Sequence, residues 1–459
     1  MTTSMTRTLA EFVFALDYER LPAPVVDKVK TCVLDAIACA CGGSDLPWSK
    51  AAVGMAAEHG GKAEASVWID GGKTGFGYAA LANAVMSHSI IQEDMHAETA
   101  AHFGSVVIPA AFALGEKLGR SGRDVIVAIV AGYEVMGRIG KAIVSPEFSR
   151  RGFRPSGMFG PFGAAAVGAK LWHLDRDQTV LAFGLAGNLA SGVNEWANAG
   201  TSDIFFHNGF AAHNGLMAAY LVQHGVTAPE RIIEGKAGLA NAWSGDQGDS
   251  AWAMADLGKV FEMERVYHKP APACAFTQET VQAAQKLVAQ YDIAADQIDG
   301  ITVSAYPMAK LYTGCDYPGP FTSLIQAQMS NQFAVASVIV HGDVNFRHYA
   351  DFADERVRDI ARKITVEIDS EATALFPERK QSKITVRMKD GTSHTVVQRD
   401  LDALGHVDIV RKLKVLGTGL FTESRLDEIV AAAAGLERLE NLAGMTALLK
   451  ANGIGRRPV

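Results

Sequence analysis

Long helical patterns built from small residues are the strongest constraint that this sequence places on its fold. Stretches such as GPFGAAAVGAK (160–170) and GFAAHNGLMAAYL (209–221) combine helical spacing with many Ala and Gly residues. Small side chains let helix axes approach closely, and several of these helices lack a clear polar face. We therefore predict a large bundle of buried helices, with helical patterns at 24–43, 78–88, 107–118, 123–144, 160–172, 177–192 and 210–224.

The pattern changes after about Glu262, where strand-like segments begin. Alternation of apolar and polar residues predicts strands at 299–306, 364–368, 383–388 and 394–398, with helices at 277–291 and 330–341. Asp390-Gly391 is typical of a hairpin turn between the last two strands. We predict a mostly α protein: a large all-helical domain, residues 1–265 rejoined by 399–459, and a smaller α+β lid domain, residues 266–398.

Composition and charge exclude several classes of protein. The 459 residues are 48% hydrophobic and 20% charged with a formal net charge of −7, which is typical of a folded protein and argues against a nucleic-acid partner. The five cysteines lack zinc-binding spacing, which favours reduced thiols and a cytoplasmic location. No apolar run is long enough to predict a signal peptide or a membrane span.

The segment from Ser87 to Glu116 holds the densest group of titratable residues. It places His88, Glu93, Asp94, His96, Glu98 and His102 within fifteen residues, just before an Ala-rich helix. We interpret it as a polar loop that supplies His102 as a general base, oriented by Asp94 or Glu93. A solvated loop without a role is the plain alternative. A metal site from Asp94, His96 and His102 is a third possibility, but the spacing matches no established motif.

Three further clusters carry residues suited to a carboxylate substrate. Arg151 and Arg154, with Arg150, lie just before a Gly-rich helix start, and arginine forks bind carboxylates bidentately. His207 lies just before the helix predicted from Phe210, and we interpret it as a second proton-transfer candidate. Lys269 lies in a Pro-rich linker where its ammonium could reach a carboxylate, whereas we read Cys274 as a small buried thiol.

These blocks, in this order, resemble the MmgE/PrpD family, which includes 2-methylcitrate dehydratase, cis-aconitate decarboxylase and iminodisuccinate epimerase. The resemblance rests on five segments: CVLDAIACACGG, the His88-to-His96 block with HFGSVVIPAAFALGE, GFRPSGMFGPFGAAAVGAK, GFAAHNGLMAA and KPAPACAFTQ. It implies a helical domain with an α+β lid, a homodimer, no cofactor, and a small polycarboxylate bound in a cleft between the domains. Its reactions begin with proton transfer at a carbon beside a carboxylate.

The family's functional positions are only partly retained. The resemblance matches His102, His207 and Lys269, and it matches the acidic segment through Glu93, Asp94 and His96, with Ile91 at its first acidic position. A family histidine falls on Arg154, a lysine on Ile204, another histidine near Gln278, and an active-site tyrosine on Phe333. Because Ile204 cannot donate a proton and Arg154 stays charged, dehydration, which needs an acid at the leaving oxygen, loses support.

The sequence therefore predicts a cofactor-independent and metal-free lyase or isomerase that acts on a di- or tricarboxylate. We assign catalytic roles to His102, His207, Asp94 and Lys269, and substrate-binding roles to Arg154, Arg151, His96, Glu93 and Gln278. Epimerisation of an iminodisuccinate-like acid and decarboxylation of a cis-aconitate-type acid are alternatives. A catalytically inactive carboxylate-binding protein and a metal-dependent hydrolase are alternatives of other classes.

Overall fold

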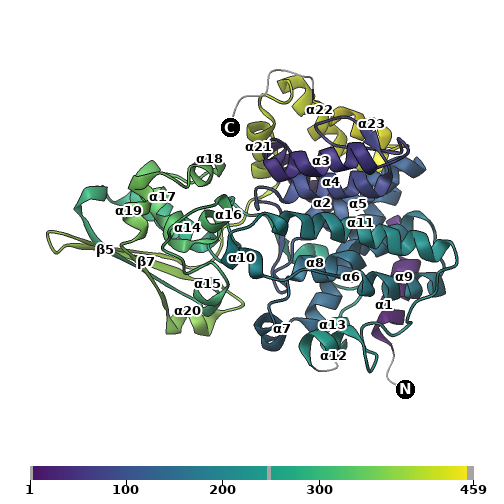
Figure 1. The fold of residues 1–459 in the computed structure, drawn as a ribbon, viewed down its shortest axis with the longest axis horizontal. Coiled ribbons are helices and arrows are strands. Elements are labelled where there is room, and N and C mark those ends of the chain that lie inside the picture. Colours follow the sequence, from purple (N-terminus) through teal and green to yellow (C-terminus); the bar gives the residue numbers. More distant parts are fainter. Residues whose placement is uncertain (1–3, 246–249, 452–459) are drawn as a thin grey trace.

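The computed structural model describes residues 4–245 and 250–451, which form a large helical unit and a smaller α+β unit beside it (Figure 1). The large unit is built on long helices: α1 (Met5–Ala15), α2 (Ala23–Gly43), α3 (Pro47–His59), α4 (Phe76–His88), α5 (Gly104–Leu118), α6 (Gly122–Ile143), α8 (Pro155–Leu171), α9 (Arg176–Asn188) and α11 (Asp203–Gln223). Short helices α7 (Pro146–Arg150), α10 (Glu195–Ala199), α12 (Leu239–Ser244) and α13 (Ser250–Met254) connect or cover them.

The small residues allow close packing of the central helices, as predicted from the sequence, because the helix backbones come into direct contact at glycines. A Cβ added at Gly215 of α11 would lie 2.2 Å from the Pro161 carbonyl oxygen of α8. A Cβ added at Gly168 of α8 would lie 2.5 Å from the Ala219 Cβ of α11. Neither distance is compatible with a side chain, so these glycines set the spacing of the α8–α11 pair.

The smaller unit is a four-stranded sheet covered by helices. Its strands β5 (Ile298–Ala305), β6 (Ile364–Ile368), β7 (Ser382–Met388) and β8 (Ser393–Gln398) are arranged in the order β6-β5-β7-β8, and only the β5–β6 pair among them is parallel. Helices α14 (Gln278–Gln290), α17 (Asn331–His341) and α19 (Glu355–Ala361) share one apolar core with the strands. Shorter helices complete the unit: α15 (Pro307–Leu311), α16 (Leu324–Met329), α18 (Phe346–Ala350) and α20 (Ser370–Leu375).

The chain then returns to the large unit, as Figure 1 shows for the yellow helices α21 (His406–Gly417), α22 (Glu423–Ala434) and α23 (Ala443–Leu448). A buried ion pair joins α21 to α2, because Lys412 Nζ lies 2.7 Å from an oxygen of Asp35. The same ammonium donates to the backbone carbonyl of Gln92 at 2.7 Å, so the tail also anchors the segment that follows α4. The mostly α fold with a smaller α+β part is confirmed. The last eight residues of the predicted tail, 452–459, lie outside the described residues.

Two local expectations were wrong. The helix predicted from Phe210 begins seven residues earlier, at Asp203, so His207 lies inside its second turn and not before its start. The segment between α4 and α5 is not a solvated loop, since His88, Glu93, Asp94, His96 and His102 are all buried. Of the described helices, none has the length and apolar character needed to span a bilayer.

Candidate active site

The segment between α4 and α5 is held inside the protein by a short strand pair. Strand β3 (Met95–His96) pairs antiparallel with β4 (Val266–Tyr267), the start of the linker that leads into the smaller unit. This pairing brings the residues around Glu93 and His102 next to Lys269, which lies two residues beyond β4. The two units therefore meet where the sequence concentrates its titratable groups.

Glu93 is the acceptor at the centre of the site. Its Oε1 accepts a hydrogen bond from His88 Nδ1 and lies 2.9 Å from His102 Nδ1. The Ser105 hydroxyl donates to the same oxygen at 3.2 Å. The 2.9 Å contact is electrostatic and lacks the alignment of a hydrogen bond, but the carboxylate still favours the neutral tautomer of His102 with its proton on Nδ1, which leaves the Nε2 lone pair free.

Two hydrogen-bond relays connect Arg154 to Glu93. In the first, Arg154 Nη2 donates to His88 Nε2 at 2.7 Å, and His88 Nδ1 donates to Glu93. In the second, Arg154 Nη1 donates to Asn208 Oδ1 at 2.6 Å, Asn208 Nδ2 donates to Ser105 at 2.8 Å, and Ser105 donates to Glu93. Since a guanidinium only donates and a carboxylate only accepts, every proton in this ring of five side chains is assigned.

Burial sets the charges of these groups. It lowers the pKa of His102 to about 4 and that of His88 to about 3, although Glu93 opposes both shifts. Burial alone would raise the pKa of Glu93, but the two imidazoles hold it well below its usual range. Burial lowers the pKa of Arg154 to about 10, so it remains a cation at neutral pH. At neutral pH the site therefore holds an anion, two neutral imidazoles and a cation.

His102 and Arg154 lie on the wall of one cavity between the two units. Ser156, Tyr312 and Cys274 add polar atoms to this wall, and the remainder is largely apolar: Ile91, Met95, Ala100, Pro155, Trp196, Ile204, Ala275, Phe276 and Met329. The Arg154 guanidinium lies 5.9 Å from the Trp196 ring centroid. Among the described residues, no carboxylate lies within ion-pair distance of Arg154, so its charge is available to an anion in the cavity.

Two of the four non-glycine residues with positive φ in the described chain lie on the same wall. Ile91 and Ala100 have φ angles of +49° and +53°, and a β-branched residue rarely adopts this conformation. The Ile91 carbonyl accepts a hydrogen bond from Lys269 Nζ, which also donates to the Ala273 carbonyl at 3.2 Å. Lys269 is fully buried and does not line the cavity. In this structure it fastens the strained segment to the linker.

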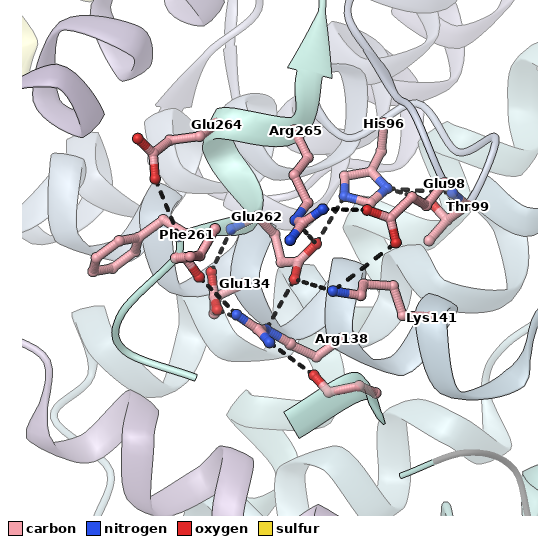
Figure 2. Close-up of polar contacts among 12 residues, drawn as sticks. His96, Glu98, Thr99, Glu134, Arg138, Lys141, Phe261, Glu262, Glu264 and Arg265 are labelled. Carbon is pink, nitrogen blue, oxygen red and sulfur yellow. Dashed lines mark hydrogen bonds and ion pairs between the residues drawn. The ribbon is translucent and has the colours of Figure 1, made fainter. Parts of the chain in front are cut away.

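A second buried network, shown in Figure 2, joins His96 of β3 to charged residues of α6 and of the segment just before β4. His96 Nε2 lies 2.9 Å from Glu262, which also binds Arg138 at 2.9 Å and Lys141 at 3.1 Å. His96 Nδ1 accepts from the Thr99 amide at 3.3 Å, so the Nε2 proton is directed to Glu262. Both ring nitrogens of His96 are engaged in this structural network, so the geometry gives no support to the substrate-binding role predicted for His96, which stays a prediction.

Asp94 and Gln278 are also engaged away from the cavity. Asp94 accepts from the Tyr133 hydroxyl at 2.6 Å and from the Gly104 amide at 2.7 Å, so Glu93 and not Asp94 orients His102. The Gln278 amide donates to the carbonyls of Ala271, Ala273 and Cys274 at 3.0–3.1 Å and thereby shapes the linker. Both side chains are buried and hydrogen-bonded within the protein, so the catalytic role predicted for Asp94 and the binding role predicted for Gln278 stay predictions that these contacts do not support.

Two other predicted residues lie outside the cavity wall. Arg151 is on the surface, where it pairs with Glu147 at 2.6 Å, so the structure does not support carboxylate binding by this residue. His207 is mostly buried beside Arg154, and burial together with that charge lowers its pKa to about 4. His207 Nε2 lies 3.5 Å from Asp203, and the residue does not line the cavity. Its proposed proton transfer stays a prediction.

The predicted metal ligands Asp94, His96 and His102 do not converge. The group that does converge in the described chain is His88, Glu93 and His102, whose ligand atoms lie within 4.8 Å of one another. His88 accepts from Arg154 on Nε2 and donates from Nδ1, so neither nitrogen has a free lone pair. The arrangement is a hydrogen-bonded network in which His88 has no lone pair left to bind a metal.

Several residues that the structure places in the site were assigned no role from the sequence. His88 and Asn208 complete the relays from Arg154, yet the sequence gives no spacing that links positions so far apart in the chain. The tyrosine on the cavity wall is Tyr312, whereas Phe333 packs against Phe321 and Tyr349 in the core of the smaller unit. The tyrosines that follow the Pro-rich linker within about 50 residues of sequence are Tyr291, Tyr306, Tyr312 and Tyr317, and they were the better candidates.

Comparison with known proteins identifies the family to which this architecture corresponds. Residues 7–251 match the MmgE/PrpD N-terminal domain, and residues 271–437 match the MmgE/PrpD C-terminal domain. The chain belongs to the MmgE/PrpD family. This MmgE/PrpD protein is 28% identical to a cis-aconitate decarboxylase of Aspergillus terreus, over 97% of this chain and 96% of the relative. It is 26% identical to a cis-aconitate decarboxylase-like protein, oryM, of Aspergillus oryzae over 97% of both chains, and 25% identical to cis-aconitate decarboxylase of Homo sapiens over 81% and 79%.

Proposed function

We propose that this MmgE/PrpD protein is a lyase or isomerase that transfers a proton at a carbon next to a carboxylate of a small di- or tricarboxylate. The observation that carries the proposal is the pairing of His102 with Arg154 on one cavity wall. His102 is neutral, its Nδ1 is held by Glu93, and no described residue makes a hydrogen bond to its Nε2. Arg154 is a buried cation whose hydrogen-bond partners, His88 and Asn208, are both neutral.

The mechanism follows from these charges. A substrate carboxylate binds Arg154, because the buried guanidinium gains an anionic partner that the protein does not supply. His102 Nε2 then removes a proton from the adjacent carbon, and Glu93 stabilises the imidazolium that forms. The negative charge that develops on the substrate carboxylate is held by Arg154 inside a cavity with mainly apolar walls, where such stabilisation is strong.

A decarboxylation is the specific reaction that we favour within this class. The walls near Arg154 include Ile91, Ile204 and Phe276, and an apolar environment disfavours a charged carboxylate more than neutral carbon dioxide. In an acid with a double bond two carbons from the carboxylate, the C–C bond breaks and its electron pair becomes a new double bond. The original double bond shifts its pair to the far carbon, which takes a proton from His102. His102 is neutral in the free protein, and in this step it first takes a proton from water, because the bound anionic substrate and Glu93 together raise its pKa. The three relatives named above, called cis-aconitate decarboxylases or decarboxylase-like, support this choice.

The test is incubation with cis-aconitate-like, citrate-like and aspartate-derived acids in D₂O, followed by NMR for deuterium on carbon and by carbon dioxide release. We expect deuterium incorporation with at least one acid, and a loss of about 10²-fold or more in His102→Gln. Arg151→Gln is the matched control, since Arg151 is a surface residue. Exchange and turnover absent from the wild-type protein, with carboxylates still raising its melting temperature, would instead establish a carboxylate-binding protein.

A further inference from the structure

Two cysteines of the smaller unit face each other at the wall of the cavity. Cys274 Sγ lies 3.6 Å from Cys315 Sγ, and both side chains are buried. Cys274 lines the cavity beside Phe276 and Tyr312, so a small reagent that enters the cavity can reach its sulfur. The other three cysteines lie on α2, and no contact between sulfurs is found among them in the described chain.

The surroundings distinguish the two thiols. The Phe276 amide donates to Cys274 Sγ at 3.5 Å, and Lys269 lies close enough for its charge to act on this sulfur. Burial would raise the pKa of Cys274, but the hydrogen bonds from Cys315 and Phe276, together with Lys269, lower it. Burial and the adjacent Cys274 raise the pKa of Cys315 well above its usual value. Of the two, Cys274 therefore forms the thiolate more readily, and Cys315 remains a thiol in contact with it.

We propose that Cys274 and Cys315 form a redox site that a small hydroperoxide entering the cavity converts to a disulfide. The Cys274 thiolate attacks the outer oxygen of the hydroperoxide, the O–O bond breaks, and the alkoxide leaves with a proton as an alcohol or as water. Cys274 is then a sulfenic acid. The Cys315 sulfur attacks that sulfur, the S–S bond forms, and the hydroxyl leaves as water with the Cys315 proton. Two thiols are oxidised and one peroxide is reduced.

The disulfide would change the cavity wall. Its sulfurs would be about 2.05 Å apart instead of 3.6 Å, so side-chain rotation and movement of the two segments together must close a gap of roughly 1.5 Å. The Cys315 amide donates to the Tyr312 carbonyl at 3.0 Å, and the Tyr312 and Phe276 rings lie 4.9 Å apart. Any movement of the Cys315 backbone toward Cys274 is passed to Tyr312 through this hydrogen bond, and to the Phe276 ring that Tyr312 contacts. Oxidation is expected to lower carboxylate binding or turnover, and reduction to restore it.

The experiment treats the full-length protein with one equivalent of hydrogen peroxide, then alkylates the remaining thiols in denaturant and maps the peptides by mass spectrometry. We expect a Cys274–Cys315 disulfide peptide in most molecules, its disappearance after dithiothreitol, and alkylated Cys32, Cys39 and Cys41. This readout needs no substrate, so it can fail while the proposed function stands, and the reverse also holds.

Two variants sharpen the result. In Cys315→Ser the sulfenic acid has no partner, so we expect Cys274 to proceed to a sulfinic acid that dithiothreitol does not reduce. Cys41→Ser, which removes a buried thiol elsewhere, is expected to form the same disulfide as the wild-type protein. Oxidation of Cys32, Cys39 or Cys41 ahead of this pair in the wild-type protein, or a Cys274 that stays alkylatable, would overturn the proposal.

Discussion

Replacing Glu93 by glutamine removes the charge on which the proposed base depends while keeping the size of the side chain. In the wild-type protein this carboxylate accepts from His88 and Ser105 and lies 2.9 Å from His102 Nδ1. A glutamine offers one carbonyl oxygen and an NH₂ group that cannot accept. His88, Ser105 and His102 all meet Oε1, whereas Oε2 has no hydrogen-bond partner within the described chain, so the glutamine places its carbonyl oxygen at the Oε1 position and keeps these contacts. It loses the negative charge that would stabilise a protonated His102.

The expected losses are large. Hydrogen bonds to a charged group contribute about 1.5–3 kcal/mol each and those between neutral groups about half as much, so Glu93→Gln should lower the free energy of unfolding by about 2–4 kcal/mol. The loss of the charge that supports the imidazolium should lower kcat by about 10²–10⁴-fold. KM should change little, because Arg154, which binds the substrate carboxylate in our proposal, keeps its contacts with His88 and Asn208.

Asp94→Asn is the matched control, since Asp94 is the adjacent buried carboxylate but contacts Tyr133 and Gly104. We expect it to lower stability while kcat falls far less than in Glu93→Gln. Urea unfolding and steady-state kinetics on the acid identified by deuterium exchange measure both effects. A kcat in Glu93→Gln within about threefold of wild type, or a larger loss of kcat in Asp94→Asn, would refute the assignment of Glu93 as the orienting group.

Three further predictions test other parts of the site. Arg154→Met should weaken binding of an unreactive dicarboxylate by about 30-fold or more, measured by calorimetry, because it removes a buried charged partner; unchanged affinity would contradict carboxylate binding by Arg154. The folded-state pKa values of His88 and His102, about 3 and 4, lie below the unfolded value near 6.5, so unfolding takes up protons in acid. Urea unfolding should therefore show a loss of about 1–2 kcal/mol per histidine between pH 7 and 5.5, and equal stability at both pH values would contradict their neutral burial. Lys269→Met should lower the melting temperature and leave the pKa values of the pH–rate profile in place, whereas a lost basic limb would show that Lys269 itself exchanges protons.

The helical bundle could be predicted because its signal is local and repeated. Glycines such as Gly168 and Gly215 recur at helical spacing, and the structure uses them where helices touch. The strands of the smaller unit were similarly predictable from alternation and from Asp390-Gly391. The start of α11 was not, because Asp203–Gly209 contains two aromatic residues and a histidine that do not distinguish a helical turn from a loop.

The sequence indicated which segments contribute residues to the candidate site, but it did not indicate which side chains contact one another there. Glu93 and Asp94 are neighbours just before β3, yet Glu93 meets His88 and His102 whereas Asp94 meets Tyr133 and Gly104. Only one of the two therefore contacts His102, and the sequence does not show which. His96, two residues beyond Asp94, meets Glu262, which is 166 residues away in the chain. Contacts of this kind depend on tertiary packing and leave no local pattern.

The separation of Arg154 from Glu93 would let one site hold both the general base and the anion-binding cation that we propose. A direct ion pair would satisfy both charges and leave neither for the substrate or for His102. Here His88 on one side, and Asn208 with Ser105 on the other, transmit hydrogen bonds between them without carrying charge. Glu93 is thus free to act on His102, and Arg154 keeps an unpaired charge on the cavity wall. Ile204 on the same wall adds no second cation, so a carboxylate that enters this cavity is directed to Arg154, beside the imidazole that would exchange its proton.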